Sequence, residues 1–260
     1  MRRKDDVTFF LFILLLAITS SSPAAPAEMS FEHLCESEIL RRVNFERSRQ
    51  LPPPPALQRD TGLNQSAQAH AEDMVQRNYV DHVSPDGVTP HERITRSHRY
   101  LLISSTGENL WMREWDGRGE SPESVARRMM EDWMASPYHR ANILNTAFTH
   151  LGIHVRRAGD RIYAVQHFAG SRGTLEPPLP ERIQRGDTLM LNVTTRDPDV
   201  ANPRKFDLID PDTFQPVCEP TYLRTGHLEA PAGRFCIRLF FLSPGEKRWE
   251  VYTGPMITVP

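Results

Sequence analysis

Three side chains between residues 82 and 140 are of the types that metal sites and acid–base sites use: His82, Glu108 and His139. His82 precedes the stretch VSPDG, Glu108 lies in GENLW, and His139 lies in SPYHR. Neutral imidazoles and carboxylates suit Zn²⁺ and similar cations, and a metal-bound water can become a nucleophile near neutral pH. The same groups could equally hydrogen-bond one another and hold loops together without any chemistry.

The chain carries no other recognised arrangement for catalysis. The pattern HExxH is absent, no serine lies in GxSxG, and no cysteine lies near the histidines in sequence. The formal net charge of −2 is not typical of a nucleic-acid-binding protein. These observations favour a binding module over an enzyme and predict no nucleic-acid partner.

The first 27 residues have the order of a secretory signal peptide. MRRK is followed by an apolar run over 7–18 and then by small residues that end at Ala27. The apolar run is shorter than the roughly 20 residues needed to span a bilayer. We therefore expect cleavage near Ala27, a secreted, periplasmic or cell-envelope location, and no transmembrane span afterwards. An uncleaved N-terminal anchor is the alternative.

The three cysteines are interpreted in the light of export, because disulfides persist in oxidising compartments. Cys218 and Cys236 lie in a region with strand-like patterns and are predicted to form a disulfide. Cys35 is left over and is expected to be a buried thiol on the first helix.

Helices and a hairpin are expected to position the candidate residues. Periodic apolar positions and capping signals predict helices over 31–49, 62–79, 121–136 and 137–144, with a short helix beginning at Pro90. In the first helix, Val43 and Phe45 are expected on the apolar side and Arg47 on the wet side. A strand hairpin is expected over 148–155 and 161–168. His70 lies beside the apolar side of the second helix and is interpreted as structural.

The composition changes after residue 170. Residues 171–180 are rich in proline and are expected to be a linker. Residues 181–260 contain short strand-like runs separated by Pro, Gly and Asp, with no helical periodicity. This pattern predicts a small all-β, sandwich-like C-terminal module.

Residues 39–168 resemble the bacterial, cysteine-poor branch of the CAP superfamily, named for cysteine-rich secretory proteins, antigen 5 and pathogenesis-related 1 proteins and also called the SCP domain. The resemblance rests on LNQSAQAHAEDM, DHVSPDGVTPHERI, GENLW, SPESVARRMMEDWMASPYHRANIL, FTHLGI and IYAVQHF, in this order. It implies an α+β fold, an α-β-α sandwich with helices over a central antiparallel sheet. The CAP domain is assigned to 31–170 and the β-rich module to 181–260.

The resemblance also implies a groove lined by two histidines and two acidic residues. His82, Glu108 and His139 match three of them, and Ser136 stands where the fourth, acidic one would be. The implied function is a secreted binding module for an extracellular or envelope lipid, glycan or protein, with Zn²⁺ or another divalent metal as a candidate cofactor. The alternatives are a structural envelope protein and a metal-dependent hydrolase centred on His82 and His139.

Overall fold

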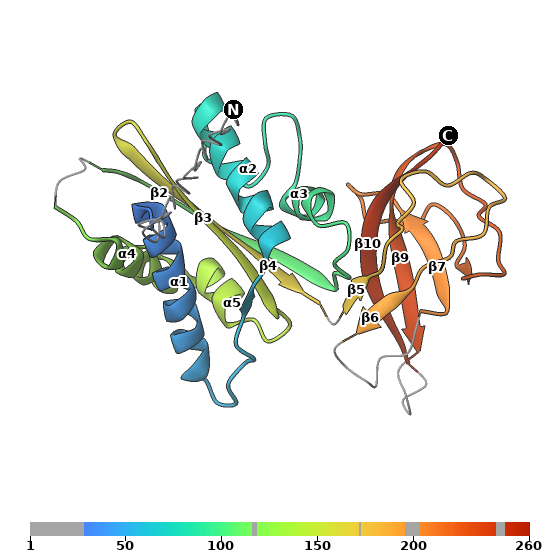
Figure 1. Cartoon of the computed structure of the whole chain (residues 1–260), viewed down its shortest axis with the longest axis horizontal. Coiled ribbons are helices and arrows are strands. Elements are labelled where there is room, and N and C mark those ends of the chain that lie inside the picture. Colours follow the sequence, from blue (N-terminus) through green and yellow to red (C-terminus); the bar gives the residue numbers. More distant parts are fainter. Residues whose placement is uncertain (1–28, 116–118, 172, 196–202, 243–247) are drawn as a thin grey trace, which may run out of the picture.

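Two β-sheets organise the chain, and the helices all lie around the first of them (Figure 1). The computed structural model describes residues 29–115, 119–171, 173–195, 203–242 and 248–260. The predicted signal peptide lies outside these residues. Within them, no helix is long and apolar enough to cross a membrane.

The predicted helices form close to their expected ends. They are α1 (Phe31–Ser48), α2 (Thr61–Arg77), α3 (Pro90–Ser97), α4 (Pro122–Ala135) and α5 (Pro137–Leu144). The side chains of Ser30, Asp60, Thr89 and Ser121 accept hydrogen bonds from the first turns of α1 to α4, respectively. Proline fits the first turn of a helix because that turn has no partner for its backbone N–H, and α3, α4 and α5 all begin with proline. Local capping signals therefore fix where most of these helices begin.

The first sheet has the order β1-β3-β4-β2 and is called sheet A. Its strands are β1 (Gln58–Arg59), β2 (Ser105–Glu114), β3 (His150–Ala158) and β4 (Arg161–Gly170). The β3–β4 and β4–β2 pairs are antiparallel, and the short β1 adds in parallel to β3. The hairpin predicted over 148–168 is confirmed as β3 and β4.

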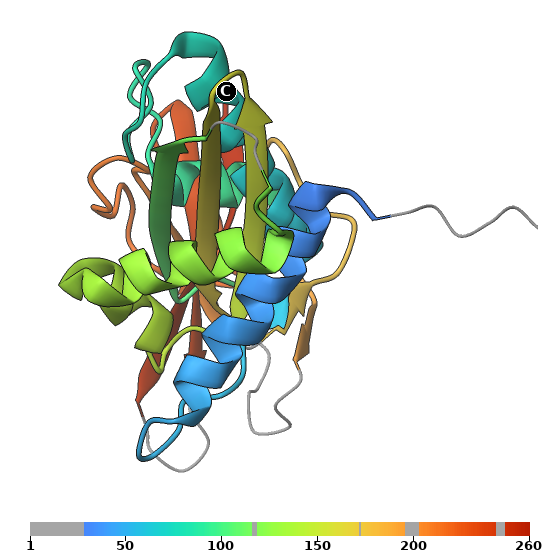
Figure 2. The same ribbon diagram turned by 90° about the vertical axis from the view of Figure 1, so that its left-hand side faces the viewer.

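Helices cover both faces of sheet A, as the α-β-α prediction requires (Figures 1 and 2). Alternate strand residues point to opposite faces. On β4, Ile162, Ala164 and Phe168 join the core that α1, α4 and α5 cover. Tyr163 and Val165 join a second core with α2. Every residue of β4 after Arg161 is buried, so the strand is enclosed on both sides.

The sequence analysis misjudged one end of α1. Phe45, expected in the core, is 54% exposed, whereas Arg47 is fully buried. The Arg47 guanidinium donates to the backbone carbonyls of Pro55, Ile143, Asn145 and Phe148. Burial lowers the pKa of Arg47 to about 10. Arg47 therefore ties α1 to α5 and to the segment before β3, a role that helical periodicity does not reveal.

The C-terminal region is β-rich, as predicted. Sheet C has the order β10-β9-β7-β8, all antiparallel, and a separate pair joins β5 to β6. These strands are β5 (Gly173–Leu175), β6 (Val193–Thr195), β7 (Lys205–Ile209), β8 (Thr221–Tyr222), β9 (Gly233–Leu242) and β10 (Trp249–Val259). One face of sheet C carries its own apolar core, built from alternate residues of β7, β9 and β10 and from the segments over that face.

The predicted disulfide between Cys218 and Cys236 is wrong, because both are free thiols. Cys236 lies on β9 among Ile209 and Met256, whereas Cys218 packs against the core on the other face of sheet C. The Cys218 sulfur accepts a hydrogen bond from the Leu208 backbone N–H at 3.3 Å. The sheet itself thus separates the two sulfurs. Cys35 is buried and free, as expected.

Candidate functional site

Glu108 is the centre of the candidate site. It lies on β2 directly opposite His167 of β4, so both side chains point to the face of sheet A that α2 and α3 cover. Its Oε1 is 2.6 Å from Nδ1 of His82. Its Oε2 accepts from Arg93 at 2.9 Å and lies 2.7 Å from Nε2 of His167. The Glu108 side chain is only 1% exposed, so this carboxylate is held inside the protein by three partners.

Arg93 of α3 positions the loop that carries His82. Besides Glu108, its guanidinium donates to the backbone carbonyls of His82 and Val88 and to Oγ of Ser84. The predicted turn is present, with the Gly87 N–H bonded to the Ser84 carbonyl and with a positive φ of 85° at Gly87. A glycine adopts this conformation without strain. The turn and Arg93 together hold His82 against Glu108.

Two further histidines lie behind Glu108 and are buried. The His70 ring on α2 is 6.4 Å from that of His167, and its Nε2 lies 3.7 Å from Oε2 of Glu108. His70 Nε2 also lies 3.1 Å from the carbonyl of Asp81. Burial lowers the pKa of His70 to about 4. Burial also lowers the pKa of His167, although Glu108 partly opposes this. Both rings are therefore neutral at pH 7.

The carboxylate of Glu108 is charged at any physiological pH. Burial by itself would raise its pKa, but the contacts with His167 and His82 outweigh burial and lower the pKa to about 2. The hydrogen bond to Glu108 in turn raises the pKa of His82. Glu108 is consequently an ion that its surroundings hold in place, and it has little tendency to take up a proton.

The asparagine of the GEN motif, Asn109, fixes the position of His139. Asn109 points to the opposite face of sheet A, where its Nδ2 donates to the His139 carbonyl and to Oε1 of Gln166. Asn142 of α5 donates to Oδ1 of Asn109 and to the Glu108 carbonyl. A Cβ at Gly107 would lie 2.8 Å from the Phe148 ring, so glycine is needed there. The three motif residues thus join α5 to β2.

The structure brings together two of the predicted residues directly and a third indirectly. His82 and Glu108 are hydrogen-bonded. His139 is linked to them through Asn109, the neighbour of Glu108, which donates to the His139 carbonyl. Burial lowers the pKa of the half-buried His139, and His82 adds to this effect. Ser136 lies between α4 and α5 and its side chain makes no capping bond. No hydrogen bond among the described residues joins its side chain to the other three.

The donor set is suited to a metal only through the two imidazoles. If His82 donates Nδ1–H to Glu108, its Nε2 keeps a lone pair, and its side chain is 51% exposed. A carboxylate that orients a histidine in this way is the usual outer partner of a metal ligand. Glu108 is already bonded on both oxygens, and the described residues contain no group of three or more His, Cys, Asp or Glu arranged to hold an ion. A cation here would need water or a bound molecule to complete its coordination.

Sequence reasoning missed Arg93 and His167 and set His70 aside. All three are distant in sequence from Glu108 and meet it only through the packing of α2, α3 and β4. One signal was present for His167. It lies in the strand-like, largely apolar run IYAVQHF, where a polar side chain needs a buried partner.

The chain is similar to known proteins over a region that includes His82, Glu108 and His139. The sequence profile of the cysteine-rich secretory protein family, CAP, matches residues 40–168. The uncharacterised protein YkwD of Bacillus subtilis (strain 168) is 34% identical over 136 residues, which is 52% of this chain and 46% of that protein. The uncharacterised membrane protein YlbC of the same organism is 34% identical over 112 residues, which is 43% of this chain and 28% of that protein. The chain thus spans less than half the length of these relatives.

A solved structure is also similar to part of this chain. It is the crystal structure of an extracellular protein containing an SCP domain from Bacillus anthracis, with 30% sequence identity and a TM-score of 0.43. The similarity covers 57% of this chain and 45% of that one.

Proposed function

We propose that this chain, which belongs to the CAP (cysteine-rich secretory protein) family through residues 40–168, is an exported binding protein whose His82 and His139 take part in holding a ligand through a divalent metal. Zn²⁺ suits imidazole ligands, and at His82 it would compete with the proton that the hydrogen bond to Glu108 favours. The ligand class is an extracellular or envelope lipid, glycan or protein with an oxygen donor that can complete the coordination.

The state of Glu108 carries the proposal. Both carboxylate oxygens are bonded, one to His82 and the other to Arg93 and His167. A general base must be free to accept a proton near neutral pH, whereas the pKa of Glu108 is lowered to about 2. Its place inside the protein therefore suits a positioning role for His82 and not proton transfer.

His82 and His139 supply the side of the site that a ligand can reach. His82 is half exposed with its Nδ1 directed at Glu108, which leaves Nε2 for a metal. The lowered pKa of His139 keeps its ring neutral and able to coordinate at pH 7. A bound metal would act there as a Lewis acid that attracts a carboxylate, phosphate or hydroxyl of the ligand.

Export is supported by the signal-peptide pattern of residues 1–27. The similar protein from Bacillus anthracis is described as extracellular. These observations support a secreted, periplasmic or cell-envelope location. Mass spectrometry of the N-terminus of the protein recovered from its native compartment would check cleavage near Ala27.

Calorimetric titration with Zn²⁺ at pH 7.5 tests the metal site. We expect His82→Ala and His139→Ala each to weaken Zn²⁺ binding by about tenfold or more, because each removes one of the two imidazole ligands. His33→Ala is the matched control, since the His33 side chain is 50% exposed and also faces a glutamate, Glu36. That variant should bind as the parent does.

Other outcomes would decide against the proposal. Equal Zn²⁺ affinity in the parent and in both site variants would show that His82 and His139 do not bind the metal. Zn²⁺-dependent cleavage of ester or peptide libraries, abolished by His139→Ala, would establish a hydrolase instead. Loss of envelope retention on deletion of 171–260, with unchanged Zn²⁺ binding, would favour a structural envelope protein.

A further inference from the structure

One face of sheet C carries exposed aromatic rings that no element covers within the described chain. Tyr222 is 57% exposed, Trp249 42% and Val251 41%, and Phe240 and Lys205 are partly exposed. These five residues are called the open face below. Large exposed apolar groups that gather on one surface commonly mark a binding site.

The register of sheet C makes the open face continuous. Tyr222 on β8 pairs with Lys205 on β7, Lys205 with Phe240 on β9, and Phe240 with Val251 on β10. Cross-strand partners lie on the same face of a sheet, so these four form one row across all four strands. Three inter-strand spacings make the row ~14 Å long. Trp249 lies beside it, with its ring 6.4 Å from the ring of Phe240.

The open face is the uncovered part of the sheet surface that α3 covers elsewhere. Further along the same surface, Cys236 and Met256 are buried and α3 packs against β10. Arg99, just beyond α3, donates to the backbone carbonyls of Met256 and Pro180. The helix stops short of the aromatic row, so the rings remain accessible. They lie beside the first lobe, which is the part of the chain built around sheet A, whereas the second lobe is built around sheet C.

Lys205 gives the open face an unmatched positive charge. Its Nζ lies 4.8 Å from the ring centroid of Tyr222 and 5.6 Å from that of Trp249. No ion pair joins it to a carboxylate within the described chain. The neighbouring Arg238 differs, because its guanidinium is hydrogen-bonded to the buried Asp207, although it also lies over the Phe240 ring, 5.2 Å from the centroid. A ligand on this surface would therefore meet one free cation between two aromatic rings.

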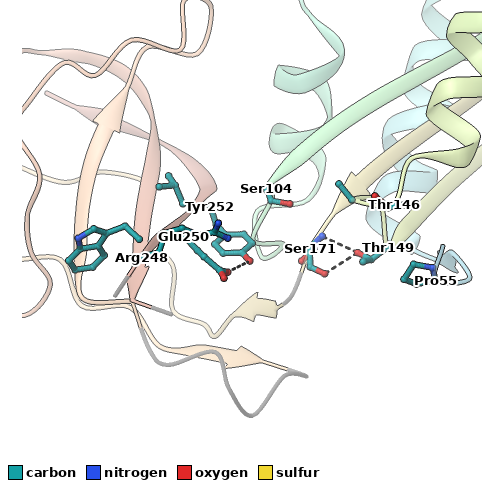
Figure 3. A pocket seen from close by; sticks show the side chains of 11 residues that line it. Pro55, Ser104, Thr146, Thr149, Ser171, Arg248, Glu250 and Tyr252 are labelled. Carbon is teal, nitrogen blue, oxygen red and sulfur yellow. Dashed lines mark hydrogen bonds between the residues drawn. The ribbon is translucent and has the colours of Figure 1, made fainter. Parts of the chain in front are cut away.

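The open face leads into a cleft between the two lobes, with a volume of about 500 Å³ (Figure 3). Trp249 and Val251 line the cleft on the side of sheet C, and Ser104, Thr146 and Thr149 line it on the side of sheet A. The wall formed by sheet C also carries Arg248 and Glu250, so it offers both apolar and charged side chains, whereas the other wall offers hydroxyl groups.

We propose that the open face and this cleft bind an acidic polysaccharide. A sugar chain presents C–H faces that can stack on Tyr222 and Trp249 and hydroxyls that can bond the wall of serine and threonine. The carboxylate or phosphate group of the polysaccharide would supply a negative charge to pair with the ammonium of Lys205. This site is separate from His82 and His139, so it does not depend on the metal proposal.

Affinity electrophoresis of the purified protein in gels containing soluble polymers tests the proposal. The acidic polymers are polygalacturonate, hyaluronate and a glycerol-phosphate polymer, and fully methyl-esterified polygalacturonate is the neutral partner of the first. We expect retardation by at least one acidic polymer. Trp249→Ala should weaken it by about tenfold or more, because a central aromatic contact is removed.

Lys205→Gln should weaken binding of the acidic polymer by about fivefold and leave binding of its neutral form unchanged, since only the charge is lost. Tyr138→Ala is the control, because Tyr138 is 86% exposed but lies on α5. Circular dichroism of each variant would confirm that it is folded.

Three results would overturn the proposal. The first is no retardation by any of the acidic polymers. The second is equal retardation of the parent, Trp249→Ala and Lys205→Gln. The third is binding to phosphatidylglycerol vesicles that requires Trp249, without binding to any polymer, which would make the surface a lipid site.

Discussion

The two lobes differ in where their charged and apolar groups lie. In the first lobe, helices cover both faces of sheet A, and the charge of Glu108 lies inside with partners on both oxygens. In the second lobe, sheet C buries one face and leaves on the other aromatic rings and Lys205, which has no ion pair among the described residues. A buried charge with all its partners specifies how elements pack, whereas an exposed charge beside rings is free to meet a ligand.

Among the changes that test this difference between the lobes, removal of Glu108 should have the largest effect on stability. We expect Glu108→Ala to lower the free energy of unfolding by about 3–5 kcal/mol, because it leaves the buried Arg93 without its carboxylate partner. Lys205→Ala in sheet C should change it by less than about 0.5 kcal/mol. Urea unfolding followed by circular dichroism would measure both. Similar small losses in the two variants would show that the Glu108 cluster contributes little to folding.

The pH dependence of stability tests whether the buried titratable groups of the first lobe hold the charge states described above. The pKa of His70 is lowered to about 4 by burial, from an ordinary value of 6.5. The unfolded chain therefore binds the proton first, so stability is full above about pH 6.5 and is lost as the pH falls towards 4. His70 alone would account for about 3 kcal/mol of this loss. The lowered pKa of Glu108 places a second loss between pH 4.5 and about 2.

Urea unfolding at pH 7.5, 6 and 5 would measure the first of these losses. His82 opposes it, because its raised pKa favours the folded state as the pH falls, but its side chain is half exposed. The variant His70→Gln should show a flatter dependence than the parent. A parent protein equally stable at pH 7.5 and pH 5 would contradict the neutral, buried state of His70.

Two glycines test how tightly each sheet is packed. A Cβ at Gly152 of β3 would lie 2.2 Å from the backbone carbon of Leu63 in α2, whereas a Cβ at Gly254 of β10 would have its nearest neighbour at 3.5 Å. We expect Gly152→Ala to cost about 1–3 kcal/mol through overpacking. Gly254→Ala should be close to neutral. Thermal unfolding would compare the two variants. Equal shifts in the midpoint temperature would show that the two sheets do not differ in packing at these positions.

Much of the local structure was predictable from the sequence because its causes are local. Proline at the first position and a capping serine or threonine mark the start of α3 and α4, and the spacing of apolar residues gives the length of α4. The turn at Gly87 follows from the residues SPDG alone. The contact between His82 and Glu108 was expected only from the resemblance to a family, since the residues of each loop by themselves do not show that the loops meet.

Tertiary structure decided which groups share a face and which are enclosed. His167 reaches Glu108 because β4 and β2 pair in one particular register, and Arg93 reaches it because α3 lies over that face. Cys218 and Cys236 have a plausible spacing, yet sheet C lies between their sulfurs. Arg47 has the composition of a surface residue and is buried because four backbone carbonyls converge on it. The sequence alone determined the helices and the hairpin of the first lobe, whereas the surroundings of each charge depended on packing between distant segments.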